Sequence, residues 1–167
     1  IMSWNTGNKK LNYSLKAHKE SVNFVSICRD LNYLASCSAD KTIKLWDLTT
    51  GKHIRTYIGH DFSINSVQFN SEAKELISSS NDGSIMIWPL ETNKQINILK
   101  GKSIKISFSD FFNRSDILSI LADNSVVRWN TSDHFLNTKL SKLTRGYNNS
   151  NSYIEFNPFA NFISKVL

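Results

Sequence analysis

Serine, histidine and aspartate, the three side chains of a hydrolase triad, recur at matched offsets in this 167-residue chain. The two sets are His18, Ser36 and Asp40, and His60, Ser78 and Asp82. In a hydrolase the serine attacks the substrate, the histidine takes its proton and the aspartate orients the histidine. An enzyme needs one such site, whereas this trio occurs twice, and the chain has no G-x-S-x-G elbow. We therefore expect a structural role for the trio and no catalytic residues.

Other residue types that could hold a metal or a phosphate are scattered along the chain. The four histidines include no H-x-x-x-H pair, and Cys28 and Cys37 do not form a C-x-x-C pair. No glycine-rich phosphate loop is present. We therefore expect no metal and no cofactor, with His53 and His134 on the surface. The two cysteines fit buried thiols in a reducing compartment.

The four tryptophans reveal an internal repeat. Their spacings are 42, 42 and 41 residues, with Trp4, Trp46, Trp88 and Trp129 as the repeated positions. A period of about 40 to 45 residues is typical of propeller blades. Six residues before each of the last three tryptophans stands an aspartate, and four residues before each aspartate stands a serine. Tryptophans at random positions would not carry the same polar neighbours.

Each repeat contains four short segments whose alternation predicts β-strands. In the first full repeat these segments are 22–27, 33–37, 43–46 and 54–58. The turn before each tryptophan strand is an Asp-led pair that suits a two-residue hairpin with positive φ. The three pairs are Asp40-Lys41, Asp82-Gly83 and Asp123-Asn124. No segment has helical periodicity longer than a turn or two, so we predict an all-β fold.

These features resemble the WD-repeat family over nearly the whole chain. The block from His18 to Asp47 is similar to a near-consensus repeat, and the block from Gly59 to Trp88 is similar to a second. The resemblance implies a β-propeller whose blades are four antiparallel strands, and a hydrogen-bonded tetrad in each blade. The implied tetrads are His18, Ser36, Asp40 and Trp46, and His60, Ser78, Asp82 and Trp88. Such a tetrad would give a half-buried tryptophan a partner for its N–H.

The third repeat departs from this pattern. It has Gly101-Lys102 where the others have histidine, which leaves a partial tetrad of Ser119, Asp123 and Trp129. Its first strand is expected early, over 104–108. The complete four-residue pattern is therefore found only in the two middle repeats.

The repeat divides the chain into three complete tryptophan-bearing blades and two half-blades. The predicted boundaries within one propeller region are a half-blade at 1–17, blades at 18–58 and 59–100, a degenerate blade at 101–143 and a half-blade at 153–167. We expect the chain to be part of a larger propeller, typically of about 4 to 8 blades. Alternatively, the half-blades join within one chain or between two chains to close a ring. Open strand edges also favour self-association.

The family's layout implies that the Asp turns and the His-bearing connections share one face of the propeller. Candidate partner-binding residues on that face are Lys19, Phe62, Asn81 and Lys102. Phe62 would be a hot spot for binding if exposed, but it would have only a packing role if it lies against the neighbouring blade. Lys19 and Lys102 would steer an acidic partner, or they are simply solvated lysines.

The resemblance favours a non-catalytic scaffold for protein–protein interaction, part of a larger intracellular protein or complex in the cytoplasm or nucleus. Other proteins or peptides would dock on one propeller face. The net charge of +6 motivates an alternative, an RNA-associated or ribonucleoprotein propeller, which requires the lysines to cluster on one face. No apolar run approaches the roughly 18 to 20 residues that span a bilayer, so we expect no membrane partner.

Overall fold

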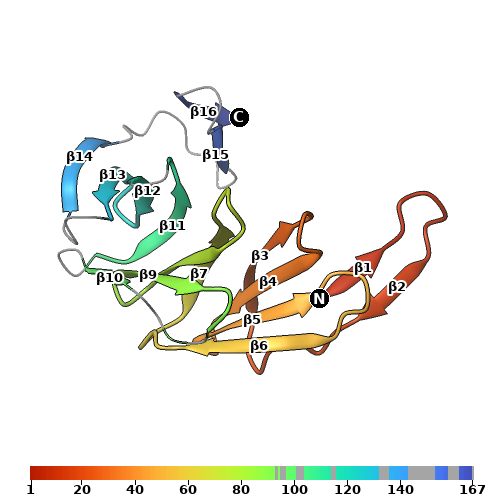
Figure 1. Ribbon diagram of the computed structural model, residues 1–167. Helices are drawn as coiled ribbons and strands as arrows, with labels where there is room; N and C mark the ends of the chain where they lie inside the picture. Colours follow the sequence, from red (N-terminus) through yellow and green to blue (C-terminus); the bar gives the residue numbers. More distant parts are fainter. Residues whose placement is uncertain are drawn as a thin grey trace.

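The computed structural model consists of β-strands joined by turns and loops (Figure 1). It describes residues 1–92, 94, 97–100, 104–113, 116–131, 136–142, 153–157 and 162–166, and the backbone alone at 97, 100, 136–142, 153–157 and 162–166. The strands in these ranges are β1 (Met2–Trp4), β2 (Leu11–Ser14), β3 (Val22–Cys28), β4 (Tyr33–Ser38), β5 (Thr42–Asp47), β6 (His53–Ile58), β7 (Ile64–Phe69), β8 (Glu75–Ser80), β9 (Ser84–Pro89), β10 (Asn97–Lys100), β11 (Ile106–Phe111), β12 (Asp116–Leu121), β13 (Ser125–Asn130), β14 (Leu136–Lys142), β15 (Tyr153–Asn157) and β16 (Phe162–Val166).

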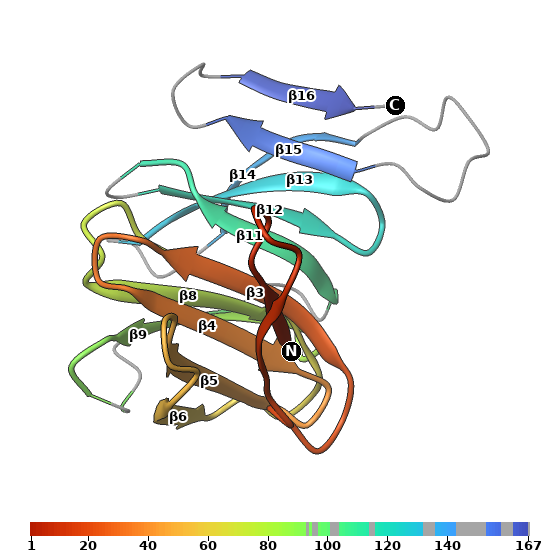
Figure 2. The same ribbon diagram turned by 90° about the vertical axis from the view of Figure 1, so that its right-hand side faces the viewer.

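Consecutive strands pair into antiparallel sheets that follow one another along the chain. Three sheets have four strands each, β3–β6, β7–β10 and β11–β14, and we call them the first, second and third blades. Two-stranded sheets, β1–β2 and β15–β16, precede and follow them. Figures 1 and 2 show the sheets arranged along an open arc, with β1–β2 and β15–β16 at its two ends. The prediction of an all-β propeller with four-stranded blades is confirmed.

Apolar side chains on facing sheets form the cores between blades. The core between the first and second blades includes Ile43, Leu45 and Tyr57 from one side, and Val67 and Trp88 from the other. A second core joins the second blade to the third and contains Trp129. Burial of about 25 cal/mol per Å² of apolar surface favours this stacking. Each blade therefore depends on its neighbours for stability, as expected of a repeat fold.

The first strands of the three blades lie at the same offset in their repeats. Strand β3 contacts β7, and β7 contacts β11. The expectation that the third blade's first strand spans 104–108 is wrong, because β11 spans Ile106–Phe111, 42 residues after β7. Ile104 and Ile106 both fit the alternating pattern, but only Ile106 is buried in the core, and Ile104 is exposed. Packing against the second blade, rather than alternation, sets the start of this strand.

The Asp-led turns each contain one left-handed residue rather than two. Lys41, Gly83 and Asn124 have φ of 67°, 76° and 60°. In each case the N–H of this residue donates to the carbonyl three residues earlier, at 2.9 to 3.3 Å. This arrangement, a turn followed by one left-handed residue, is a common way to join two strands. In the first and second blades, the aspartate of the turn is hydrogen-bonded to the histidine of the same blade.

Candidate functional site

The first tetrad is a continuous chain of hydrogen bonds. The Nε1–H of Trp46 donates to Ser36 Oγ at 2.9 Å. Ser36 Oγ lies 2.8 Å from His18 Nε2, and His18 Nδ1 lies 3.0 Å from Asp40 Oδ2. The structure thus brings together four side chains from β4, β5, the Asp turn and the connection before β3.

The carboxylate at one end of this chain fixes the direction of every hydrogen bond. An ionised aspartate only accepts, so His18 donates from Nδ1 and presents the lone pair of Nε2 to Ser36. The Ser36 hydroxyl then donates to His18 and accepts from Trp46. Thr42 Oγ1 also donates to Asp40, at 2.6 Å, and the Lys19 N–H donates to it at 3.0 Å. Each of the four side chains thus has a hydrogen-bond partner inside the blade.

The second tetrad repeats the same geometry. Trp88 Nε1 donates to Ser78 Oγ at 2.9 Å, Ser78 Oγ lies 2.8 Å from His60 Nε2, and His60 Nδ1 lies 2.8 Å from Asp82 Oδ2. The Asp61 N–H donates to Asp82 as the Lys19 N–H does to Asp40. The tetrad therefore ties the connection before the first strand to the Asp turn in both blades.

A serine from the first strand takes part in the third blade, where histidine is missing. Trp129 Nε1 donates to Ser119 Oγ at 3.0 Å, and Ser119 Oγ lies 2.6 Å from Ser109 Oγ. The Ser109 N–H in turn donates to Ser66 of the second blade at 3.1 Å. Asp123 accepts hydrogen bonds from the N–H and the hydroxyl of Ser125. Ser109 was not among the predicted site residues, because it does not stand at the repeat position that histidine occupies in the other blades.

Burial and hydrogen bonding shift the pKa values of the first tetrad. Burial alone would raise the pKa of Asp40, but hydrogen bonds from Thr42, the Lys19 N–H and His18 outweigh it and lower that pKa to about 2. Burial lowers the pKa of His18, and Asp40 opposes this shift only in part. A neutral His18 beside an ionised Asp40 is therefore the stable state at neutral pH.

Neither tetrad serine is accessible to a substrate. Ser36 and Ser78 are fully buried, and each hydroxyl already binds a tryptophan and a histidine. A nucleophile must reach the reacting atom, and these hydroxyl groups cannot. Across the described residues, no group of three or more His, Cys, Asp or Glu side chains could hold a metal ion.

The His-bearing connections and the Asp turns lie at one end of the blades, which we call the His–Asp face. Hydrogen bonds from the Ala39 N–H to Ser21 and from the Asn81 N–H to Ser63 join connection to turn in the first and second blades. Lys19 is exposed on this face. Asn81 is half-buried, and its Oδ1 accepts a hydrogen bond from Asn65. Lys102 lies outside the described residues.

Phe62 is the most conspicuous apolar residue of the His–Asp face. Its side chain is 59% exposed, and the ammonium group of Lys41 lies 5.8 Å from its ring centroid. A cation at this distance stabilises a partly solvated ring only weakly. Of the two alternatives for Phe62, exposure fits this geometry better than packing against the neighbouring blade.

Two asparagines that the sequence analysis did not select link neighbouring blades. Asn23 Nδ2 donates to the carbonyl of Ile64, and Asn65 Nδ2 donates to the carbonyl of Ile106, both at 2.7 Å. They lie 42 residues apart, at the same repeat position. That shared offset was the available signal. These bonds fix the relative positions of the first strands under the His–Asp face.

Comparison with known proteins identifies two repeats in this chain. A family model described as WD domain, G-beta repeat matches residues 9–47 and 51–89. A Lissencephaly-1 homolog of Heterostelium pallidum is 66% identical over 29 residues, which is 17% of this chain and 7% of that protein. A probable E3 ubiquitin ligase complex SCF subunit scon-2 of Neurospora crassa is 47% identical over 53 residues, or 32% of this chain and 8% of that protein.

A solved structure extends the similarity over most of the chain. The crystal structure of the WD40 beta propeller domain of Doa1 superposes with a TM-score of 0.71 and 28% identity, covering 83% of this chain and 46% of that chain. The matched segments therefore amount to a small part of the two curated relatives and less than half of the Doa1 chain. None of the described residues forms a helix able to cross a membrane.

Proposed function

We propose, because this chain belongs to the WD-repeat β-propeller family, that it is a non-catalytic surface on which other proteins or peptides dock. The observation that carries this proposal is that the tetrad side chains hydrogen-bond to one another inside each blade. We therefore assign the tetrads a structural role and the loops above them a role in binding. The scon-2 relative is by name a subunit of a ubiquitin ligase complex. Two buried free cysteines, Cys28 and Cys37, fit our proposal of an intracellular setting.

The His–Asp face is our proposed docking surface. The tetrads fix the conformation of its loops, so an exposed side chain on these loops is already positioned before a partner binds. Binding through preorganised loops avoids part of the entropy cost of association. An exposed phenylalanine at such a place is typical of a binding hot spot. Lys19 and Lys41 would add positive charge around Phe62.

Replacing Phe62 and Lys19 together with alanine should weaken partner binding at least tenfold without changing thermal unfolding. Truncating one hot-spot aromatic costs about 2 kcal/mol or more of binding free energy. Proteins retained by the tagged native chain would be quantified against those retained by the variant, and the Kd of the leading partner would then be measured. Ile54→Ala is the matched control, since Ile54 is an exposed apolar residue at the other end of β6 from the His–Asp face. A shift in unfolding with unchanged binding would refute the docking surface.

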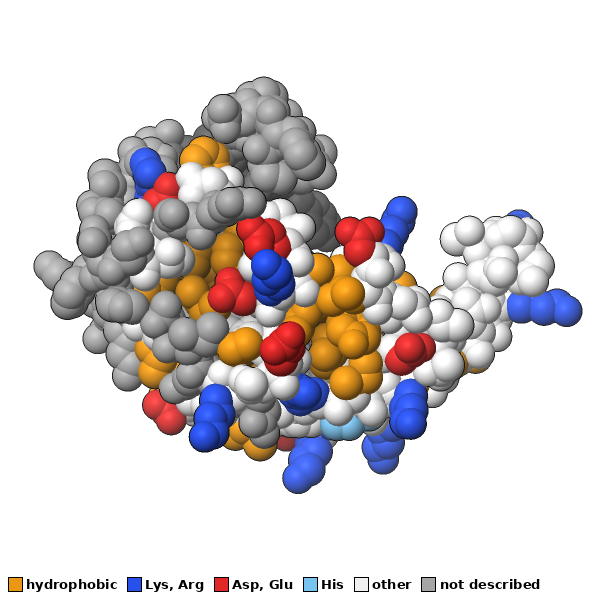
Figure 3. All heavy atoms as spheres, viewed as in Figure 1, with side chains coloured by type: hydrophobic (Ala, Val, Ile, Leu, Met, Phe, Trp, Pro, Cys, Tyr) orange, Lys and Arg blue, Asp and Glu red, His pale blue; other side chains and the backbone are white. Residues whose placement is uncertain are grey.

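No specific observation favours the RNA alternative. On the face shown in Figure 3, the Lys and Arg side chains form no continuous patch, and several are next to Asp or Glu. Nucleic-acid binding through phosphates needs a contiguous basic surface.

A further inference from the structure

A cavity of about 680 Å³ opens between the blades at the end opposite the His–Asp face. Its lining comes from the ends of β3, β7 and β11 and the turns that follow them. Because the strands are antiparallel, these turns lie at the other end of each blade from the Asp turns. The cavity therefore takes no part in the tetrads or in the proposed docking surface.

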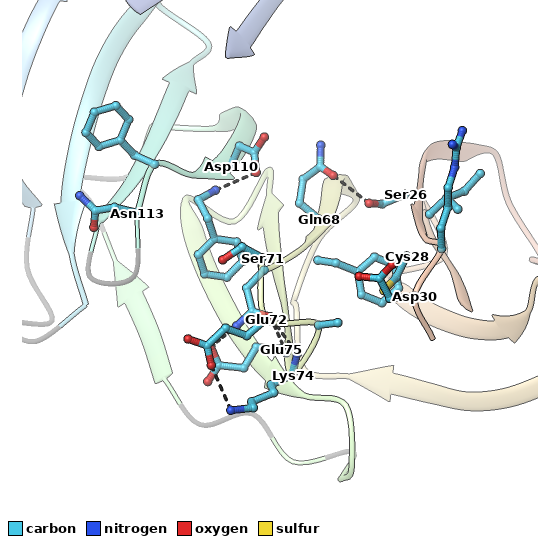
Figure 4. Close-up of a pocket in the computed structure, with 17 residues that line it drawn as sticks. Ser26, Cys28, Asp30, Gln68, Ser71, Glu72, Lys74, Glu75, Asp110 and Asn113 are labelled. Carbon is cyan, nitrogen blue, oxygen red and sulfur yellow. Dashed lines mark hydrogen bonds and ion pairs between the residues drawn. The ribbon is translucent and has the colours of Figure 1, made fainter. Parts of the chain in front are cut away.

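The same repeat position of each blade contributes one polar side chain to the cavity. These residues are Ser26, Gln68 and Asp110, spaced 42 residues apart. Ser26 Oγ donates to Gln68 Oε1 at 2.8 Å, and Figure 4 shows Asp110 on the far side of Gln68 from Ser26. Ser26 of the first blade and Gln68 of the second are thus hydrogen-bonded to each other, whereas Asp110 of the third blade presents its carboxylate to the cavity.

Asp110 differs from Glu72 and Glu75 of the same lining, because the partner of its carboxylate is a backbone N–H and theirs are side chains. Within the described part of the chain, it accepts one hydrogen bond, from the adjacent Phe111 N–H at 2.8 Å. Glu72 pairs with Lys74 at 3.0 Å, and Glu75 accepts from Asn70 at 3.1 Å. Burial raises the pKa of Asp110 to about 6, so the ionised carboxylate is destabilised where it stands.

The other walls of the cavity suit the aliphatic part of a basic side chain. Ile27 is half-exposed into this region, and Phe69, Phe111 and Phe112 also line it. The two basic residues of the lining do not satisfy Asp110, since Lys74 is paired with Glu72 and no contact joins Arg29 to Asp110 in the described residues. Four acidic residues line a cavity of a chain whose net charge is +6.

We propose that this cavity binds a lysine or arginine side chain of a partner protein, with its cation on the Asp110 carboxylate. The cation would form a charge-assisted hydrogen bond, while its methylene groups would cover Ile27 and Phe69. This binding site rests on the proposed docking function, adds a basic side chain as the group recognised at a second face, and does not depend on Phe62.

The test uses the full chain with N-acetyl-arginine methylamide, N-acetyl-lysine methylamide and the uncharged norleucine analogue as probes. Amide NMR shifts of Gln68, Asp110 and Phe111 should saturate with the two cations at millimolar concentration. The norleucine analogue and the Asp110→Asn variant should each bind about tenfold more weakly, as expected when one charged partner is removed. The carboxyl carbon of Asp110 should also titrate at a lower pH when a cation is bound.

Asp61→Asn, which removes an exposed carboxylate at the opposite end, should leave these shifts unchanged. Phe62→Ala should also leave them unchanged, so failure of the His–Asp docking surface and failure of this cavity can be told apart. Shifts that do not saturate, or that are the same in the folded Asp110→Asn variant, would overturn the proposal.

Discussion

Ser78→Ala should lower the free energy of unfolding by about 3 kcal/mol, although it removes a single oxygen atom. Ser78 is fully buried and bridges Trp88 Nε1 at 2.9 Å and His60 Nε2 at 2.8 Å. Alanine leaves both nitrogen atoms buried without their partner, and each orphaned group costs about 1 to 3 kcal/mol. Urea unfolding followed by tryptophan fluorescence measures the loss. Ser71→Ala, at an exposed turn serine, should change stability by less than about 0.5 kcal/mol.

A double-mutant cycle separates the network from simple packing. Trp88→Phe removes the indole N–H and keeps an apolar ring, so Ser78→Ala should cost at least about 1 kcal/mol less in that background. Equal costs in both backgrounds would mean that the serine does not act through the tryptophan. The third blade is an internal comparison, because there the serine bridges Trp129 to Ser109 and not to a histidine.

Features that lie within one blade were predictable from the sequence. The tryptophan, serine, aspartate and histidine of a tetrad lie on adjacent strands and turns of the same sheet, so fixed offsets in sequence become fixed distances in space. The structure brings together both four-residue sets. Four-stranded blades followed from the alternation and the Asp-led turns, although those turns have one left-handed residue each.

Features that depend on contact between blades were not predicted. The alternation of Ile104, Ile106 and Phe108 fitted two starting points for β11, and only burial against the second blade selects one. The links from Asn23 and Asn65, and the shared position of Gln68 and Asp110 in the cavity, arise where sheets meet. A search for polar residues recurring at 42-residue spacing, and not only for tryptophan's neighbours, would have found these positions.

Lowering the pH should destabilise the protein in two separate steps. The first, below about pH 6.5, follows from His18: its folded pKa lies below the ordinary value of 6.5, so the unfolded chain takes up a proton that the folded chain refuses. The second follows from Asp40, whose pKa falls from 3.8 to about 2 on folding. Its contribution of about 2 kcal/mol is present above pH 5 and is lost as the pH falls through 3.8 toward 2.

Asp82 should add to the second step, because hydrogen bonds from His60 and Ser84 outweigh burial and hold its pKa well below the ordinary value. Asp110 acts in the opposite sense: its raised pKa means that stability is gained as the pH falls through about 6. The Asp110→Asn variant removes that opposing contribution and should make the His18 step steeper. Urea unfolding at pH 7.5, 5 and 3 measures each step.

Asp40→Asn is the variant that isolates the second step. It keeps an oxygen acceptor for Thr42 but cannot ionise, so it should be less stable than the native chain at pH 7.5, and the difference should shrink by about 1 kcal/mol by pH 3, with the remainder lost as the pH falls through about 2. Parallel stability curves for the two proteins would mean that the Asp40 carboxylate contributes nothing through its charge.

The connection before β3 on the His–Asp face is bound to the Asp40 carboxylate by a hydrogen bond from the Lys19 N–H. Acid should therefore loosen the proposed docking surface around Lys19 before it unfolds the cores between the blades, and amide exchange at Lys19 should report that order.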